Sequence, residues 1–444
     1  MSSKTKTTAT KEEARPALVP KLRFPEFRGA KAWASEPMGE VYSFKGNNSL
    51  SRDKLNYVAG SVKNIHYGDI HTKFSTHFDI TKELVPFINE SEEGIVRDEN
   101  LCAEGDMIFA DASEDMADIG KSIEVVSLNG ERVVSGLHTI LARRIGDRLA
   151  LGFGGHLFKS GWVRTQIQKE AQGAKVLGIS ANRMRNLRLP LPHAEAEQQK
   201  IAECLSSVDE LMAAQARKVD ALKTHKKGLM QQLFPGEGET QPRRRFPEFQ
   251  NAGEWKTREL SDFITERNEY PKEKVPLFSL TIEDGVTPKT ERYERSFLVN
   301  DEADAYKLVL PNDFAFNPMN LRFGAIGRHS GTEQVAVSKY YNIFSCDKTV
   351  DFRFCEIYFR SERMVAFYDD RAIGSLIEKR RVHFAAFLKF NIRFPRLPEQ
   401  QRIATCLSSL DALITAETQR LEALKTHKKG LMQQLFPSAE EVEA

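Results

Sequence analysis

The sequence lacks the features that would indicate a membrane protein or a disulfide-stabilised one. No apolar run approaches the roughly 18 residues of a membrane-spanning helix. Its five cysteines form no Cys-x-x-Cys pair, which argues against disulfides and zinc and favours reduced thiols in a cytoplasm. Residues 1–19 are rich in Ser, Thr, Lys and Ala and contain no apolar signal region, so they are predicted to be a disordered N-terminal tail.

Intact catalytic motifs are also missing. Gly120-Lys121-Ser122 resembles the end of a phosphate-binding loop, but Asp115 stands where that loop needs glycine, and a carboxylate there would repel phosphates. Residues 317–320 read Asn-Pro-Met-Asn, which opens like an amino-methyltransferase motif but lacks its second proline and stacking aromatic. There is no His-Glu-x-x-His or Gly-x-Ser-x-Gly pattern. We therefore expect a non-catalytic chain that binds no metal and no cofactor of its own.

Charge of either sign is hardly in excess, because 64 Lys and Arg face 62 Asp and Glu. The basic residues are nevertheless unevenly placed. Residues 159–188 hold seven of them against one acid, Glu170, and residues 379–396 hold six and no acid. Local basic blocks on a nearly neutral chain indicate discrete surfaces that face phosphates. The alternative is solvated charge on unrelated faces.

One long amphipathic segment occurs twice. Residues 197–235 return at 399–437, and the fifteen residues 221–235 return unchanged. Apolar residues that alternate at spacings of four and three are typical of a coiled-coil seam. The predicted seam consists of Ile201, Leu205, Val208, Met212, Val219, Leu222, Leu229 and Leu233 in the first copy, and of Ile403, Leu407, Leu410, Ile414, Leu421, Leu424, Leu431 and Leu435 in the second.

The two helices are predicted to pair with each other and to run antiparallel. Each copy ends at Leu-Phe-Pro, where proline cannot continue the helix. The link at 236–239 is too short to span a rod of about 55 Å, so parallel helices are excluded and one globular domain is expected at each end. Four polar seam positions are interpreted as fixing the register, namely Gln215, Lys226, Glu417 and Lys428.

The repeat extends into the globular halves. Residues 23–27, Arg-Phe-Pro-Glu-Phe, followed by Trp33, return at 245–249 followed by Trp255. Further anchors match as well: Gly105-Asp106 with Asn312-Asp313, Ile119-Gly120 with Ile326-Gly327, and Leu157-Phe158-Lys159-Ser160 with Tyr358-Phe359-Arg360-Ser361. Between the anchors the halves hardly agree, which fits a shared scaffold with diverged surfaces.

These patterns predict an α+β fold with two tandem, pseudo-two-fold-related globular domains separated by two long antiparallel coiled-coil helices. The predicted organisation is a tail at 1–19, a first domain at 20–192, a helix at 193–235, a second domain at 236–396, a helix at 397–437 and a tail at 438–444.

Two diverged halves, each followed by the same helix, resemble the specificity (S) subunit of type I restriction-modification enzymes. The most specific residues are the Leu-Pro and Glu-Gln-Gln-Lys/Arg-Ile-Ala helix starts at 191–202 and 397–404, together with the helix ends at 222–235 and 424–437. The resemblance implies that each half is a target recognition domain reading one part of an asymmetric, bipartite site on double-stranded DNA. It implies that the helices act as a ruler and contact two methyltransferase (M) subunits, with restriction (R) subunits completing the complex. S-adenosylmethionine, ATP and Mg²⁺ would then belong to these partners.

The candidate DNA contacts are basic residues, because Arg and Lys read base edges and bind phosphates. They are Lys175, Arg183, Arg185 and Arg188 in the first half, and Arg322, Arg328, Lys379, Arg380 and Arg381 in the second. Tyr340 and Tyr341 are interpreted as core aromatics. The alternative function is a protein–protein scaffold that does not bind DNA, and a stand-alone nuclease or methyltransferase is the least supported reading.

Overall fold

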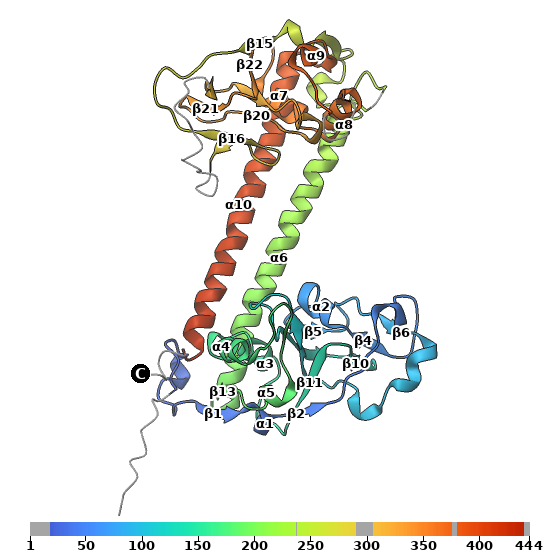
Figure 1. The fold of residues 1–444 in the computed structure, drawn as a ribbon, viewed down its shortest axis with the longest axis vertical. Helices are drawn as coiled ribbons and strands as arrows, with labels where there is room; N and C mark the ends of the chain where they lie inside the picture. The colour runs from blue at the N-terminus through green and yellow to red at the C-terminus, as the bar shows by residue number, and fades with distance from the viewer. Residues whose placement is uncertain (1–17, 237, 290–304, 375–379, 439–444) are drawn as a thin grey trace, which may run out of the picture. The chain divides into compact units, whose positions relative to one another are not determined.

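The computed structural model describes residues 18–236, 238–289, 305–374 and 380–438. The chain divides into two compact units (Figure 1): a first unit of Met1–Ala216 with Gln419–Ala444, and a second unit of Arg217–Thr418. Each unit contains one lobe of strands and short helices, together with half of each long helix. The predicted α+β class is confirmed. No helix within these described ranges is both long and apolar enough to cross a bilayer.

The repeated segments form the two long helices. They are α6 (Glu195–Leu233) and α10 (Leu397–Leu435), each 39 residues long. At a rise of 1.5 Å per residue each is about 58 Å long. Both end two residues before a proline, Pro235 or Pro437, as the sequence predicted.

In the first unit the last part of α10 lies beside the first part of α6. Lys428 Nζ of α10 bonds Asp209 Oδ1 of α6 at 2.5 Å. Leu435 shares a buried core with Ile201 and Leu205. A high residue number on one helix therefore faces a low number on the other, which makes this half of the pair antiparallel.

The second unit shows the same direction. Lys226 Nζ bonds Asp411 Oδ1 at 2.5 Å, and Lys218 Nζ bonds Glu417 Oε1 at 2.5 Å, so positions that rise along α6 fall along α10. Lys226 and Asp411 are the repeat equivalents of Lys428 and Asp209, so one charged pair is made twice. Lys226 and Lys428 are two of the polar seam positions, and each has its carboxylate partner only in this register, so a shifted register would lose the pair.

The predicted seam residues are all buried or half-buried. Leu211 and Leu413, each one position before a seam residue, are 57% and 41% exposed. The buried seam members are Ile201, Leu205, Val208, Val219, Leu233, Ile403, Leu407 and Leu435. The half-buried members are Met212, Leu222, Leu229, Leu410, Ile414, Leu421, Leu424 and Leu431.

The first lobe is built on a five-stranded sheet with the order β2-β11-β7-β9-β5, antiparallel except for the β5–β9 pair. Its strands are β2 (Tyr42–Lys45), β5 (His77–Asp79), β7 (Met107–Ala110), β9 (Ser122–Ser127) and β11 (Thr139–Arg144). A second sheet, in the order β10-β4-β6-β3, consists of β3 (Leu55–Asn56), β4 (Lys63–Ile65), β6 (Phe87–Ile88) and β10 (Val133–Ser135). Two strand pairs complete it: β1 (Ala34–Pro37) with β13 (Arg188–Leu191), and β8 (Ala112–Ser113) with β12 (Leu177–Gly178).

Short helices cover the sheets of the first lobe. The α-helices are α1 (Met38–Val41), α2 (Tyr67–Thr72), α3 (Phe153–Leu157), α4 (Gly161–Glu170) and α5 (Ala181–Met184). The 3₁₀ helices are η1 (Pro25–Phe27), η2 (Arg52–Lys54), η3 (Glu90–Ile95) and η4 (Asp98–Asn100).

The second lobe has a four-stranded sheet with the order β15-β22-β19-β20. Its strands are β15 (Ile264–Arg267), β19 (Phe314–Phe316), β20 (Ile326–Arg328) and β22 (Asn342–Cys346). Two-stranded pairs are β14 (Lys256–Glu259) with β23 (Asn391–Phe394), β16 (Phe278–Thr281) with β17 (Gly285–Pro288), and β18 (Tyr306–Val309) with β21 (Val335–Ser338). Its helices are α7 (Phe352–Phe359), α8 (Glu362–Arg371), α9 (Phe384–Leu388), η5 (Pro247–Phe249), η6 (Leu260–Asp262) and η9 (Leu321–Phe323).

At one repeat anchor the two halves have different residues but keep the same backbone turn. Gly105 and its equivalent Asn312 both have left-handed backbones, with φ of +86° and +68°. Asparagine is the non-glycine residue that adopts this conformation most readily, so the replacement keeps the turn. The aspartate that follows closes the turn in each lobe, because Asp106 accepts a hydrogen bond from Ala103 N at 2.8 Å and Asp313 accepts one from Leu310 N at 2.9 Å.

Candidate DNA interface and helix clamps

A buried ion pair fastens the beginning of the first lobe to the first turn of α6. Arg23 Nε and Nη2 donate to Glu197 Oε1 and Oε2, both at 2.7 Å, and Trp33 Nε1 donates to Oε1 at 3.2 Å. Glu197 is 1% exposed. The Trp33 ring also meets Phe436, just beyond α10, edge to face at 6.0 Å. We refer to Arg23, Trp33, Glu197 and Phe436 as the first clamp.

The second unit contains the same clamp at the repeat positions. Arg245 Nε and Nη2 donate to Glu399 at 2.8 and 2.5 Å, and Trp255 Nε1 donates at 3.4 Å. The Trp255 ring meets Phe234, just beyond α6, at 6.3 Å. Each clamp thus joins the start of one long helix to the end of the other. This contact explains why the Arg-Phe-Pro-Glu-Phe, Trp and Glu-Gln-Gln segments repeat together.

The glutamine after each clamp glutamate binds the lobe backbone. Gln198 Oε1 accepts a hydrogen bond from Ala150 N at 2.9 Å, and its Nε2 donates to Pro192 O at 3.2 Å. Gln400 Oε1 accepts from Asp351 N at 2.9 Å, and its Nε2 donates to a nearby carbonyl oxygen at 2.9 Å. The amide side chain offers an NH₂ donor and a carbonyl acceptor on two separate atoms, so glutamine suits this position.

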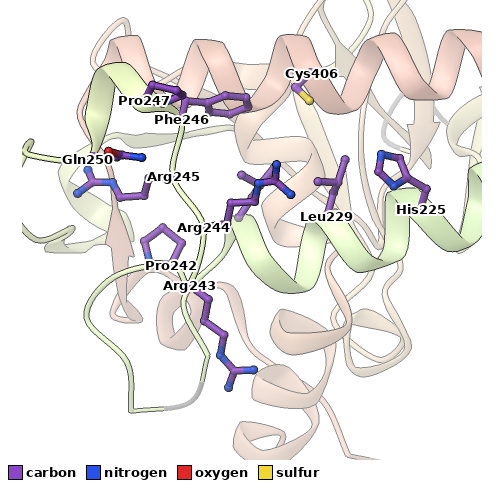
Figure 2. Close-up of a pocket in the computed structure, with 11 residues that line it drawn as sticks. His225, Leu229, Pro242, Arg243, Arg244, Arg245, Phe246, Pro247, Gln250 and Cys406 are labelled. Atoms are coloured by element: carbon purple, nitrogen blue, oxygen red, sulfur yellow. The ribbon is translucent and has the colours of Figure 1, made fainter.

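A pocket of about 690 Å³ lies beside the second clamp (Figure 2). Residues 242–250 form one wall, and Leu229 of α6 and Cys406 of α10 line the others. Figure 2 shows the Phe246 ring lying along α10. The Arg402 guanidinium covers that ring at 4.5 Å from its centroid. The lining mixes apolar and cationic groups, which suits the side chains of a protein partner.

Two of the basic candidates in the first lobe make polar contacts within the lobe. Arg183 Nη1 pairs with Glu170 at 3.0 Å, and Arg188 Nε donates to Ser35 Oγ at 3.1 Å.

Lys175 and Arg185 are the first-lobe candidates that lie open to solvent. Lys175 stands in the loop between α4 and β12 and is exposed. Arg185 follows α5, is exposed, and its guanidinium lies over the Phe44 ring at 5.0 Å. A stacked guanidinium keeps its N–H donors at the ring edge, where a phosphate or a base edge could accept them.

In the second lobe the structure brings two candidates together. Arg322 Nε pairs with Asp369 Oδ1 at 2.8 Å, and Arg380 Nη1 lies 3.6 Å from the same oxygen. The Arg322 guanidinium also covers the ring of Phe323, which is 53% exposed. Arg381 is close in the chain and pairs with Ile373 through the backbone. An exposed aromatic beside clustered arginines is a common feature of nucleic-acid surfaces.

The remaining second-lobe candidates do not join this arginine cluster. Arg328 Nε pairs with Glu356 at 2.9 Å. Lys379 lies outside the described residues. Tyr341 packs against a buried cluster, but Tyr340 is 78% exposed, so its interpretation as a core aromatic is wrong. It follows a strand end, where an aromatic can reach the surface as readily as the core.

A partly buried polar cluster connects the first lobe to α6. Ser206 Oγ lies 3.3 Å from both His77 Nδ1 and His156 Nε2. Burial lowers the pKa of His77 and lowers that of His156 well below its ordinary value. Glu124, which accepts hydrogen bonds from two backbone amides in the same region, has a pKa raised by burial to about 7. His156 is 0% exposed, so this Ser–His contact is structural.

The described ranges show no grouping of three or more His, Cys, Asp or Glu side chains that could hold a metal ion. All five cysteines are free thiols.

Comparisons with known proteins agree with the sequence-based resemblance. A family model described as "Type I restriction modification DNA specificity domain" matches residues 374–426. The fold is similar to that of the type I restriction-modification S subunit from M. genitalium, with a TM-score of 0.56 and 12% identity over 94% of this chain and 99% of that one. A structure described as "Structural basis underlying complex assembly and conformational transition of the type I R-M system" gives a TM-score of 0.54 and 15% identity over 91% and 98%. No curated protein matches the chain. In fold and in the sequence around its second long helix, the chain is similar to type I specificity subunits, and the predicted resemblance is confirmed.

Proposed function

We propose that this chain is the DNA specificity subunit of a type I restriction-modification complex. Each lobe reads one part of a bipartite site on double-stranded DNA, and the unlike lobes make that site asymmetric. The chain has no catalytic role of its own. Methylation of adenine and cleavage of DNA belong to the partner subunits, which carry S-adenosylmethionine, ATP and Mg²⁺, and the complex works in the cytoplasm.

The observation that carries the proposal is the division of the chain into duplicated and diverged parts. The ends of the helices at 221–235 and 423–437 are identical, and the clamp residues repeat as well. The lobe surfaces do not: Arg322 and Arg380 gather at Asp369 in the second lobe, whereas the first lobe presents Lys175 and Arg185. Duplicated surfaces bind two copies of one partner, and diverged surfaces bind two different half-sites.

The same surface features occur next to the clamp in both units, which supports the proposal that two methyltransferase subunits are the partners. Arg402 covers Phe246 in the second unit, and Lys200 covers Phe24 in the first at 5.9 Å, so both units present a cation over an aromatic ring next to a clamp. Leu211 and Leu413, the exposed leucines of the two helices, repeat in the same way. Restriction subunits join through the assembled complex.

The direct experiment is to express the chain with its methyltransferase partners and to map methylated adenines by single-molecule sequencing. We expect a split motif with two unlike halves and an unread spacer. Exchanging the second lobe for that of another specificity subunit should change one half of the motif only. Cleavage or methylation by the purified chain alone would contradict the proposal.

The alternative is a protein–protein scaffold that does not bind DNA, and the small net charge of +2 is the observation in its favour. Binding to random-sequence duplex at low salt separates the two. Neutralised phosphates release counterions and give a steep salt dependence, whereas a protein scaffold gives none.

A further inference from the structure

A small pocket in the first lobe gathers three cations around one carboxylate. Its volume is about 260 Å³. The loop that precedes β9, the junction between α3 and α4, and α4 itself all contribute to its wall. The lining residues are Ala117, Asp118, Lys121, Ser122, Phe158, Lys159 and Arg164.

The three cations are held in place by neutral oxygens. Lys121 Nζ donates to a carbonyl of α2 at 2.8 Å, and Lys159 Nζ donates to the hydroxyl of Thr76. Arg164 Nη2 donates to two carbonyl oxygens of the loop before β9, at 2.9 and 2.7 Å. Asp118 is the acid of the lining, 3.5 Å from Lys121 and half-exposed. Asp118 offsets part of the positive charge, so three cations of the lining share one carboxylate.

The cations are close enough to influence one another. The pKa of Lys159 is lowered to about 8, first by loss of hydration around its ammonium group and then by repulsion from Lys428, with Lys121 and Arg164 adding smaller contributions. Asp209 acts in the opposite direction. Lys159 as a whole residue is exposed. Other cations lie near its ammonium group, so the electrostatic potential there is positive.

The second lobe neutralises the equivalent position. The repeat places Arg328 at the position of Lys121, and Arg328 pairs with Glu356 at 2.9 Å. The first-lobe equivalent of Glu356 is Gly155, which has no side chain to offer a charge. One scaffold thus holds a paired arginine in the second lobe and, in the first, a pocket whose three cations share the carboxylate of Asp118.

We propose that the pocket formed by Lys121, Lys159 and Arg164 binds a phosphate group. Several N–H donors converging on one space match the oxygens of a phosphate, and charge-assisted hydrogen bonds of this kind are the strong ones. The group is either a phosphodiester of the DNA backbone, which rests on the proposed function, or a free phosphate ion. Lys121 belongs to the Gly120-Lys121-Ser122 sequence, so this segment contacts phosphate through side chains instead of through the backbone cradle of a phosphate-binding loop.

The first arm of the test uses inorganic phosphate. Thermal unfolding of the full chain is compared in phosphate and in chloride at equal ionic strength, for wild type, Lys121→Gln, Lys159→Gln and the control Lys31→Gln, an exposed lysine in the first unit. A ligand that binds only the folded state raises the melting temperature. We expect the phosphate-specific increase in wild type and control and its loss in the two pocket variants. General salt effects are common to all four proteins and cancel.

The second arm uses duplex DNA. Removing one phosphate contact should lower the slope of log binding constant against log salt by about 0.9. A smaller slope in Lys121→Gln and Lys159→Gln, with Lys31→Gln unchanged, assigns the site to the DNA backbone. If the two pocket variants lose the phosphate-specific increase in melting temperature but wild type does not bind DNA, the phosphate site is supported and the proposed function is contradicted. If neither the phosphate protection nor the salt slope differs between wild type and both pocket variants, the proposal is overturned.

Discussion

Arg23 and Glu197, 174 positions apart in the chain, form a bidentate ion pair with two N–O distances of 2.7 Å. Removing one partner leaves the other charged and buried, which costs about 3–5 kcal/mol. We predict this loss for Glu197→Ala, measured as the free energy of unfolding in denaturant. Amide hydrogen exchange in the first turn of α6 should become faster in this variant, because that end of the helix is no longer held by the clamp. The exposed Glu210→Ala is the matched control, and an equal effect of the two changes would contradict the clamp's role.

Arg185 and Arg188 are close in the chain but are predicted to have different roles, Arg188 in stability and Arg185 in DNA binding. Arg188 bonds Ser35 within the first lobe, so Arg188→Ala should cost about 1.5–3 kcal/mol of stability. Arg185 is exposed over Phe44, so Arg185→Ala should change stability by less than about 0.5 kcal/mol. Its effect should appear in duplex binding as a reduced salt slope. Unchanged DNA affinity and slope in Arg185→Ala would remove Arg185 from the predicted interface.

The pH dependence of stability should carry a signature of Glu124. Its folded pKa of about 7 lies above the ordinary value of 4.5, so its contribution is fully present below pH 4.5 and is lost as the pH rises through 7. The loss corresponds to roughly 3 kcal/mol. Glu124→Gln should abolish this slope, seen as a wild-type minus variant difference between pH 5 and 8. A difference that does not vary with pH would show that Glu124 titrates normally.

The buried histidines predict a change of opposite sign. Because the pKa values of His77 and His156 are lowered on folding, stability is lost as the pH falls below the ordinary value of 6.5. The effect is checked by unfolding between pH 7 and 5 in the Glu124→Gln background. Replacing His156 by Gln should flatten the curve, and an unaltered curve would be the contrary result.

The long helices should set the length of the unread spacer. Inserting one heptad after Ala216 in α6 and one after Thr418 in α10 keeps the contacts within each unit. Seven residues add about 10 Å of helix, equivalent to about 3 base pairs. Methylation mapping should then show both half-sites unchanged and a longer spacer. A motif with its original spacer would argue against the ruler function.

Sequence reasoning predicted the parts of the fold that repeat or follow a simple period. The seam from Ile201 to Leu233 and the helix stops before Pro235 and Pro437 follow from spacing and from proline chemistry. The strand order and the pairing of Arg322 with Asp369 could not be predicted, because they depend on contacts between residues far apart in the chain.

The sequence contains a signal for the clamps. Arg23, Trp33 and Glu197 all have repeat equivalents, and three repeated polar or aromatic residues on separate segments indicate mutual contact. Lys121, Lys159 and Arg164 could not be grouped in this way, because only folding brings their segments together around one pocket.

Because each clamp takes the start of one helix and the end of the other, the first lobe is completed by Phe436, a residue from the far end of the polypeptide. Residues 221–235 are identical to 423–437, so a fragment ending at Pro235 carries its own version of that missing end. Two such fragments could complete each other as a homodimer with two like lobes. If each lobe reads one half-site, as proposed, a dimer of this kind would recognise a palindrome, and a circularly permuted chain would retain both clamps.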